Sequence, residues 1–275
     1  MIPLPKPPKI INKKNNSATF EIEGLYPGYG VTIGNSLRRV LLSSLEGAAV
    51  TKAKIKGVQH EFSTIPGVVE DVITIMMNFK KMRFRLHGDE PQTAYLKVKG
   101  LPAGKKDKEI KGSDFEFPTQ VELVNKSCHI ATITDKKADL EIEIQIERGV
   151  GYQPVEQLKK QKKSEVGVLF VDAIFTPVKK VSFRVENMRV GDRTDFDRLY
   201  LEITTDGIIS PEEAFSLASG ILVEHFSLFV ESLPLPQREE KEESKDKKSK
   251  NSKSGKKESA EKKKKKNSGK AKAKK

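Results

Sequence analysis

Hydrophobic and polar residues alternate through much of the middle of the chain. Over residues 83–148 the period is mostly two, which is typical of strands that bury one face. The clearest stretch sets four aliphatic residues against acidic and amide ones: Leu140, Ile142, Ile144 and Ile146 alternate with Glu141, Glu143, Gln145 and Glu147. The same spacing predicts strands over residues 18–25, 49–56, 168–175, 181–186 and 198–204.

Two earlier segments follow a helical spacing of three and four residues. Residues 32–45 have an apolar face and an arginine pair that points elsewhere: Ile33, Leu37, Val40 and Leu41 against Arg38 and Arg39. Residues 67–80 carry a similar apolar stripe: Val68, Val72, Ile75 and Phe79. Residues 1–17 include four prolines and predict a loose arm, while charged residues 105–111 and 159–165 predict loops.

A third helix has the strongest start signal in the chain. Ser210 is placed to act as N-cap, Pro211 is the first helical residue, and Glu213 completes a capping box. Prolines from Pro234 onward stop the helix, so the sequence predicts a helix over about residues 211–233.

This third helix is apolar over more than one face. Its two adjacent ladders are Phe215, Ala218, Leu222, His225 and Phe229, and Ala214, Leu217, Ile221 and Leu228. A single packing contact needs a narrower stripe. The helix is therefore either enclosed on two sides within one domain or shared between its own sheet and a second copy of the chain.

The positive charge of the chain is concentrated near its C-terminus. Residues 237–275 hold 18 lysines and arginines and 7 acidic residues, a net charge of +11, which leaves +2 of the total +13 for the remainder. With almost no apolar residues, this tail cannot bury enough surface to offset chain entropy, so we expect residues 236–275 to be disordered. The nearly neutral remainder gives no compositional reason to expect nucleic-acid binding by the folded part.

Cysteine usage and hydropathy indicate the compartment. The one cysteine, Cys128, excludes an intrachain disulfide and a four-thiolate metal site, and it fits a reducing compartment. The N-terminal residues lack the apolar core of a secretory signal, and no run approaches the roughly 20 apolar residues of a membrane span. We therefore expect a soluble, cytoplasmic protein.

The sequence offers no pattern typical of a catalytic site. The chain has four histidines, His60, His87, His129 and His225. None has a second ligand at metal-binding spacing, so structural roles are favoured for all of them. In the glycine-rich residues 28–34 the third glycine falls one place late for a dinucleotide loop, and these glycines are expected to shape a turn before the helix. We predict no catalytic, cofactor-binding or metal-binding residue on this chain.

Two long segments have a distinctive sequence. The first is GYGVTIGNSLRRVLLSSLEGAAV at 28–50, continued by IKGVQHEFST at 55–64 and GVVEDV at 67–72. The second is LFVDAIFTPV at 169–178, followed by VEN at 185–187, RTDFD at 193–197 and DGIISPEEA at 206–214. In order and spacing they resemble the α-subunit family of bacterial RNA polymerase, over roughly residues 18–233.

The resemblance implies an α+β fold in two parts, similar to the N-terminal domain of that family. One part, residues 1–47 and 178–235, would be a dimerisation domain with helices packed on a sheet. The other, residues 48–177, would be an inserted, mostly β domain. The disordered lysine-rich tail would follow.

The resemblance also implies protein contacts. In the family, the first and last helices pack against those of a second copy, which favours the shared-helix interpretation. The matching dimer residues here are Ile33, Leu37, Leu41, Leu217, Ile221, Leu222, Leu228 and Phe229. One copy binds the β subunit, and the matching residues are Arg38, Arg39 and Leu42. The other copy binds β′, and the matching residues are Lys80, Leu169 and Val171.

By the same resemblance the chain would be a non-catalytic subunit of DNA-directed RNA polymerase, a nucleotidyltransferase. It would be a homodimeric scaffold that nucleates assembly of β and β′, and the magnesium ions would lie in those large catalytic subunits.

The tail departs from the family pattern. The family usually carries a second small helical domain that binds promoter DNA, and nothing after Pro236 matches it. Lysine runs at 262–266 and 270–275 could instead contact DNA phosphates without sequence preference, or simply solubilise the chain. A free-standing nucleic-acid-binding protein that acts through this tail is the competing interpretation.

Overall fold

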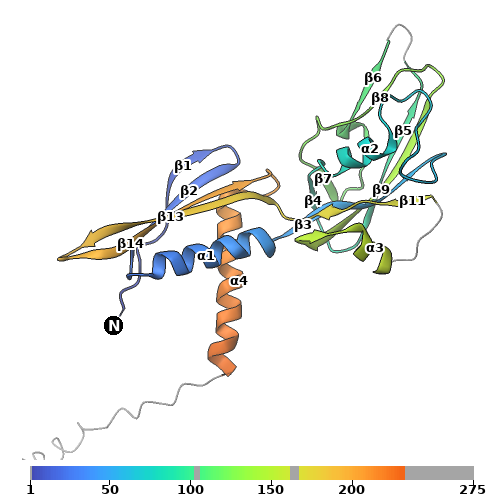
Figure 1. Cartoon of the computed structure of the whole chain (residues 1–275). Helices are drawn as coiled ribbons and strands as arrows, with labels where there is room; N and C mark the ends of the chain where they lie inside the picture. Colours follow the sequence, from blue (N-terminus) through green and yellow to red (C-terminus); the bar gives the residue numbers. More distant parts are fainter. Residues whose placement is uncertain (1, 102–105, 162–166, 233–275) are drawn as a thin grey trace, which may run out of the picture. The chain divides into compact units, whose positions relative to one another are not determined.

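The computed structural model describes residues 2–101, 106–161 and 167–232 (Figure 1). The helices are α1 (Tyr29–Ser43), α2 (Val72–Phe79), α3 (Val155–Gln161) and α4 (Pro211–Ser232), with a 3-10 turn η1 (Gly112–Asp114). The strands are β1 (Lys9–Lys14), β2 (Ser17–Leu25), β3 (Glu46–Ile55), β4 (Phe84–Leu86), β5 (Gln92–Lys99), β6 (Lys108–Lys111), β7 (Val121–Leu123), β8 (His129–Ile133), β9 (Asp139–Val150), β10 (Tyr152–Gln153), β11 (Val168–Phe170), β12 (Ala173–Ile174), β13 (Val178–Val190) and β14 (Arg193–Thr205). This confirms the predicted α+β class. The tail predicted to be disordered lies outside the described residues.

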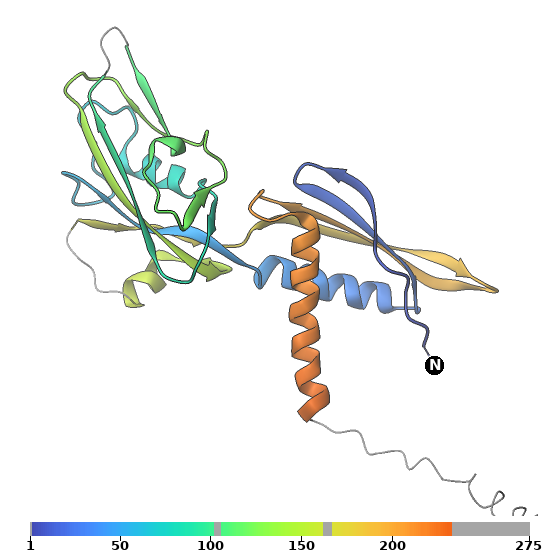
Figure 2. The same ribbon diagram turned by 180° about the vertical axis from the view of Figure 1, so that it is seen from behind.

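The first and last parts of the chain build one antiparallel sheet in the order β1-β2-β14-β13. Alternate residues of β2, including Phe20 and Ile22, are buried, as the period of two predicts. The buried face packs against α1 through Leu37 and Leu41, and against the first turns of α4 through Ala214 (Figure 2). A single sheet therefore carries both predicted long helices on one face.

Strand β1 corrects the expectation that residues 1–17 form a loose arm. Its six residues are all exposed, yet they pair with β2 from Lys9 to Lys14. Prolines end at Pro8, immediately before the strand, so every residue of β1 keeps the N–H that a ladder requires. Polar composition concealed the strand because neither of its faces is buried.

The glycine-rich residues 28–34 allow α1 to pack closely against the sheet. The N–H groups of Gly28 and Gly30 both donate to Asp197 Oδ2, at 2.9 and 3.0 Å. Gly28 has φ of 85°, and a Cβ on Gly34 would lie 2.7 Å from the Phe183 ring. The turn thus needs glycine for backbone conformation and for close approach of α1 to the sheet. It also starts α1 at Tyr29, three residues before the predicted start.

Helix α4 begins as the sequence predicts. Ser210 Oγ accepts from the Glu213 N–H at 3.2 Å, and the Ser210 N–H donates to Glu213 Oε2 at 2.8 Å, which completes the capping box. The helix then leaves the sheet, and every residue from Val223 to Ser232 is exposed (Figure 1).

The length and composition of α4 also correct the hydropathy analysis. The helix has 22 residues, and its most apolar window has a mean hydropathy of 1.3. By length and hydropathy alone, a helix of this kind could cross a membrane. It is the one helix among the described residues that meets these criteria. A helix with two apolar faces for protein packing has the same composition, so the apolar surface has a second explanation.

The β-rich remainder contains a six-stranded sheet in the order β5-β9-β3-β4-β7, with β11 on β3. The predicted alternation of β9 is confirmed, because Leu140, Ile142, Ile144 and Ile146 are all buried. Helix α2 covers this core with Val72, Ile75 and Phe79. Separate two-stranded ribbons pair β6 with β8 and β10 with β12.

Strand β3 departs from the simple alternation predicted for residues 49–56. Ala49, Val50 and Thr51 are all buried, and the pairing register with β9 shifts between Val50 and Lys52. An inserted residue at a bulge reverses the faces of the residues beyond it, so consecutive residues can be buried.

Four other boundaries differ from the prediction. Helix α2 starts at Val72 and not at residue 67, because Val68 bridges to Ile133 of β8. Residues 168–175 form two short strands, β11 and β12. The predicted loop at 105–111 contains β6, and the one at 159–165 overlaps α3. The first three of these differences arise from strand pairing with residues outside each segment.

Candidate protein-interaction surfaces

An apolar groove lies beside α1 and α4 and has a volume of about 380 Å³. Ile33 of α1, Phe215, Leu222 and Val223 of α4, and Pro5 of the N-terminal arm line it. The groove includes Val223 and Phe226 of α4, which are 65% and 58% exposed. Contiguous apolar surface of this kind is typical of a protein-interaction site.

The predicted dimer residues fall into two groups. Leu37 and Leu41 are buried between α1, the sheet and α4; Leu37 also lines the groove, whereas Leu41 is fully buried. The others are half-buried or exposed: Ile33, Ile221 and Leu222 pack at the edge of the core, and Leu217, Leu228 and Phe229 are exposed. The sequence missed Val223 and Phe226, which are exposed on α4 and also line the groove.

The arginine pair of α1 points away from the sheet. Arg38 and Arg39 are both exposed, and neither forms an ion pair among the described residues. Leu42, one turn after Arg38, is half-buried beside the same core as Leu41. Two guanidinium groups next to an aliphatic side chain can bind carboxylates while burying apolar surface.

Lys80 lies at the end of α2 and is already paired. Its Nζ donates to Asp172 Oδ2 at 2.7 Å, and Asp172 Oδ1 accepts the Val155 N–H at 2.9 Å. Burial raises the pKa of Asp172, but the bonds from Lys80 and Val155 outweigh it and hold that pKa below the ordinary value of 3.8. The pair fixes the segment of Asp172 to the end of α2.

Leu169 and Val171 are in the core and not on the surface. They are 4% and 1% exposed, and both pack into the β-rich core. Their side chains can position the segment around Asp172, but they cannot themselves be an outer contact surface in this structure. Exposed apolar residues that the sequence analysis passed over lie around α2: Phe62, Val69, Ile73 and Met77.

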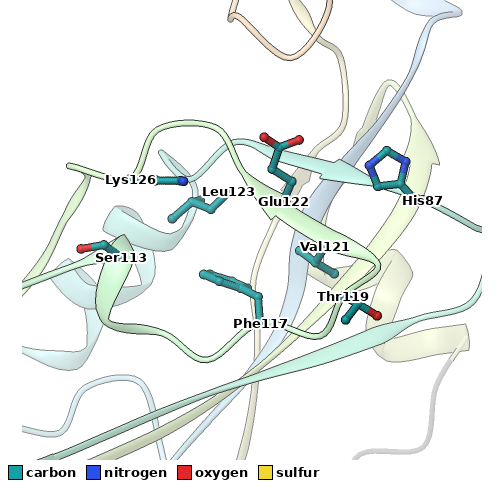
Figure 3. A pocket seen from close by; sticks show the side chains of 8 residues that line it. All are labelled: His87, Ser113, Phe117, Thr119, Val121, Glu122, Leu123 and Lys126. Atoms are coloured by element: carbon teal, nitrogen blue, oxygen red, sulfur yellow. The ribbon is translucent and has the colours of Figure 1, made fainter.

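A concave surface of about 550 Å³ lies over the β4–β7 edge of the sheet (Figure 3). Phe117 lies in its middle, and Lys126 and His87 lie at opposite ends (Figure 3). The hydroxyl groups on this surface belong to Ser113 and Thr119, and neither is hydrogen-bonded to His87 among the described residues. The surface therefore lacks the paired nucleophile and base of a hydrolytic site. Within the described ranges no cluster of three or more His, Cys, Asp or Glu residues is placed to hold a metal ion.

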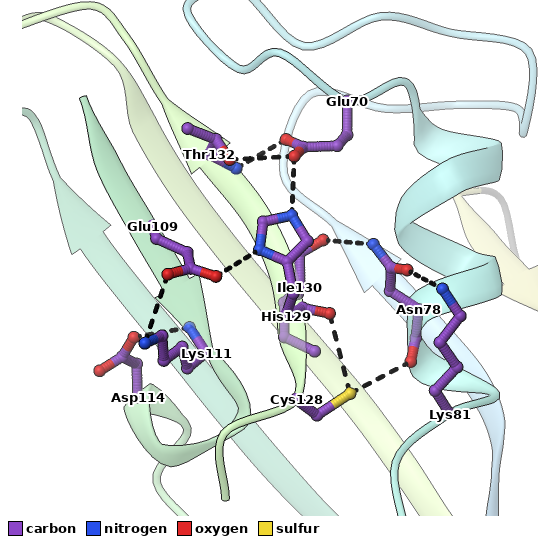
Figure 4. A network of polar contacts seen from close by, with 10 residues as sticks. All are labelled: Glu70, Asn78, Lys81, Glu109, Lys111, Asp114, Cys128, His129, Ile130 and Thr132. Atoms are coloured by element: carbon purple, nitrogen blue, oxygen red, sulfur yellow. Dashed lines mark hydrogen bonds and ion pairs between the residues drawn. The ribbon is translucent and has the colours of Figure 1, made fainter. Parts of the chain in front are cut away.

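Three of the four histidines make polar contacts within the chain. His60 Nδ1 lies 3.1 Å from Ser63 Oγ, and His225 Nδ1 lies 2.8 Å from the Ile221 carbonyl oxygen. His129 lies between two carboxylates (Figure 4). Cys128 is half-buried beside it, and burial raises the pKa of the thiol, which is unfavourable for a nucleophile.

Known proteins are similar to this chain in sequence over most of its length. Residues 53–176 match the family model described as the RNA polymerase Rpb3/RpoA insert domain. The DNA-directed RNA polymerase subunit alpha of Syntrophomonas wolfei is 50% identical over 220 residues, which cover 80% of this chain and 67% of that protein. The corresponding subunit of Carboxydothermus hydrogenoformans is 50% identical over 225 residues, or 81% and 69% of the two chains.

A more distant relative gives the same result. The DNA-directed RNA polymerase subunit alpha of Aquifex aeolicus is 46% identical over 231 residues, which cover 82% of this chain and 70% of that protein. Identity at this level extends over both the four-stranded sheet and the β-rich part. The chain therefore belongs to the α-subunit family of DNA-directed RNA polymerase.

Proposed function

We propose that two copies of this chain pack together through α1 and α4, and that the dimer carries the β and β′ subunits of RNA polymerase. The observation that carries the proposal is the apolar surface of α4, which is exposed from Val223 onward and joins the groove beside Ile33. A two-fold dimer uses the same patch twice, so the protruding helix of one copy can fill the groove of the other.

The proposed dimer gives each predicted interface residue a role. Ile33, Leu217, Ile221, Leu222, Leu228 and Phe229 would contact the second copy, together with Val223 and Phe226. Leu37 and Leu41 would support α1 from beneath, because they are buried within one chain. Residues 1–47 and 178–235 would form this dimerisation domain, and residues 48–177 the insert.

Charge insertion on α4 tests the dimer. Val223→Glu places a carboxylate in the proposed interface, where burial without a partner is strongly unfavourable, and should weaken dimerisation by about 100-fold or more. Ser216→Glu adds the same charge at an exposed polar residue of the same helix and should leave the dimer intact. Sedimentation velocity of the full chain measures both. A Val223→Glu variant that remains as dimeric as the Ser216→Glu control would overturn the proposed interface.

We place the β contact at Arg38, Arg39 and Leu42. Exposure of both guanidinium groups, without ion pairs among the described residues, supports this. Arg39→Ala should keep the fold and the dimer but lose capture of purified β subunit, whereas Arg189→Ala, which removes an exposed arginine from β13, should retain it. Loss of the dimer in Arg39→Ala would contradict this division of roles.

We place the β′ contact at the end of α2, around Lys80 and the segment of Leu169 and Val171. The Lys80–Asp172 ion pair supports it by fixing that segment beside α2. Lys80→Ala should reduce the recovery of β′ on a preformed complex with β, with little effect on β itself. Equal recovery of β′ by the variant and the parent chain would remove Lys80 from this contact.

We assign catalysis, with its magnesium ions, to the large subunits and a structural role to this chain. The lysine-rich residues 237–275 are proposed to hold DNA through phosphate contacts, because their net charge is +11. Deletion of 237–275 should make promoter binding by the assembled enzyme less dependent on salt. An unchanged salt dependence would remove DNA as the ligand of the tail.

A further inference from the structure

The side chain of His129 lies between two carboxylates that belong to different segments (Figure 4). Its Nε2 is 2.8 Å from Glu70 Oε1, and its Nδ1 is 3.1 Å from Glu109 Oε1. Glu70 precedes α2, Glu109 lies on β6, and His129 begins β8. A single imidazole ring thus connects three segments of the β-rich part.

Backbone pairing also joins the same three segments. On one side, Val69 donates its N–H to the Thr132 carbonyl at 3.0 Å, and Val68 bridges to Ile133. On the other side, β6 has four residues and pairs with β8 alone in a two-stranded sheet. A short two-stranded ribbon is marginally stable by itself, so side-chain bonds contribute to its position.

The protonation state of the ring decides how many of these bonds can form. A neutral imidazole has one N–H donor and one acceptor nitrogen, whereas an imidazolium has two donors. Ionised carboxylates can only accept. The observed geometry, with a carboxylate oxygen at each nitrogen, is therefore fully satisfied only when the ring is protonated.

The two carboxylates are held differently. Glu70 has a side chain that is 13% exposed, and it also accepts from the Thr132 N–H at 2.6 Å and the Thr132 hydroxyl at 3.0 Å. Glu109 has a side chain that is 51% exposed and has an alternative cation, because Lys111 Nζ lies 3.3 Å from its other oxygen. When the ring loses a proton, the bond to Glu70 is the one that the structure retains.

The surrounding charges fit this asymmetry. Burial raises the pKa of Glu70, but the bonds from Thr132 and His129 outweigh it and keep the pKa below 4.5. Lys111 and His129 likewise lower the pKa of Glu109. Other titratable groups around this site are Asp114, which accepts the Lys111 N–H, Lys81, which follows α2 and bonds to Asn78, and Cys128, whose thiol pKa is raised by burial.

We propose that His129 is a proton-operated clasp that holds β6 to β8 and to the segment before α2. When protonated it bridges Glu70 and Glu109; when neutral it keeps Glu70, releases Glu109 and loosens β6. Ile110 is fully buried, so the release is local and the β-rich core stays folded. The outcome is a ribbon whose mobility changes in the pH range where histidine titrates.

The test is a pH titration of the full chain from about pH 5 to about pH 8.5, followed by NMR of the histidine ring carbons. Glu109→Gln and Glu70→Gln keep the side-chain shape but remove the charge of one acceptor of the ring, so in each variant the pH dependence of the His129 ring-carbon shifts should differ from that of the parent chain. His60, whose ring contacts Ser63 and not a carboxylate, is the internal control, and its ring-carbon shifts should not differ between the variants and the parent chain.

Hydrogen exchange measures whether β6 becomes more mobile when His129 loses its proton. After correction for intrinsic pH effects, the β6 amides should exchange faster above the His129 midpoint than below it in the parent chain. In Glu109→Gln that step should disappear, while exchange in β9 is unchanged throughout. A His129 midpoint that both glutamine variants leave in place overturns the clasp, and so does equal β6 protection on either side of the midpoint.

Discussion

The four-stranded and six-stranded sheets differ in how far they cover the helices packed on them. Helix α2 of the β-rich part has its apolar stripe fully covered, with Ile75 and Phe79 0% and 1% exposed. Helix α4 on the four-stranded sheet covers that sheet with Ala214 and Ala218, and from Val223 onward it is exposed. The β-rich part completes its core within one chain, whereas the four-stranded part needs another surface to cover α4.

This difference fits the proposed role. A scaffold requires one region that folds without help and a second that remains incomplete until it assembles. Exposed apolar surface is unfavourable for an isolated protein, and the exposed apolar residues of α4 are the basis of the proposed contact with a second copy. Changes to the two regions should therefore separate stability from assembly.

The largest effect is expected from the covered helix. Phe79→Ala removes a buried ring that contacts Phe115 edge-on, at 6.3 Å between centroids, and should destabilise the chain by about 3–5 kcal/mol. Met77→Ala truncates an exposed residue of the same helix and should cost under about 0.5 kcal/mol. Urea unfolding measures both. Equal costs for the two variants would show that the β-rich core is not closed as described.

Replacing one glycine in each of α1 and α4 compares how closely the two helices are packed. A Cβ on Gly34 of α1 would lie 2.7 Å from the Phe183 ring, so Gly34→Ala should cost about 1–3 kcal/mol through overpacking. A Cβ on Gly220 of α4 would meet no atom within 4 Å, so Gly220→Ala should stabilise the helix by about 0.5–1 kcal/mol. Thermal unfolding distinguishes them, and a stabilising Gly34→Ala would contradict the close packing of α1.

A smaller effect is expected at the start of α4. Ser210→Ala removes the hydroxyl that accepts the Glu213 N–H and should cost about 1 kcal/mol. Ser216→Ala, which alters an exposed serine within the same helix, is the control and should cost nothing measurable. Helical content followed by circular dichroism during urea unfolding checks this. Identical midpoints for both variants would mean that the capping box does not stabilise the helix.

The smallest expected effect is on the loss of stability at acidic pH. Because the pKa of Glu70 is lower in the folded chain than its ordinary value of 4.5, its carboxylate stabilises the fold above that pH. The contribution is lost as the pH falls through the lowered pKa. Glu70→Gln should therefore flatten the decrease in the free energy of unfolding between neutral pH and about pH 3. A decrease as steep as that of the parent chain would exclude Glu70 as a source of acid sensitivity.

Local signals in the sequence predicted the elements whose partners do not alter their pattern. The alternation of β9 needed only a buried sheet face, and the capping box at Ser210 needed only residues three positions apart. The apolar spacing of α4 likewise predicted a helix over about residues 211–233, and the helix spans Pro211–Ser232. These features depend on side-chain spacing, which the sequence contains directly.

Long-range pairing produced the features that the sequence did not show. Strand β1 has no buried face, the bulge after Val50 moves β3 out of its alternation, and pairing of Val68 with β8 delays the start of α2. The family resemblance implied that Leu169 and Val171 contact another subunit, but only the fold shows that both side chains are buried. The clasp at His129 joins three segments that are far apart in sequence, so no spacing rule could have found it.

The most direct measurement is native mass spectrometry of the complex recovered through a tag on this chain from its own cells. We expect a particle that contains two copies of the chain and one copy each of two very large subunits, β and β′. The Val223→Glu variant should lose the second copy and both large subunits together. Recovery of nucleic acid alone, or of the large subunits with a single copy of the chain, would contradict a dimeric scaffold.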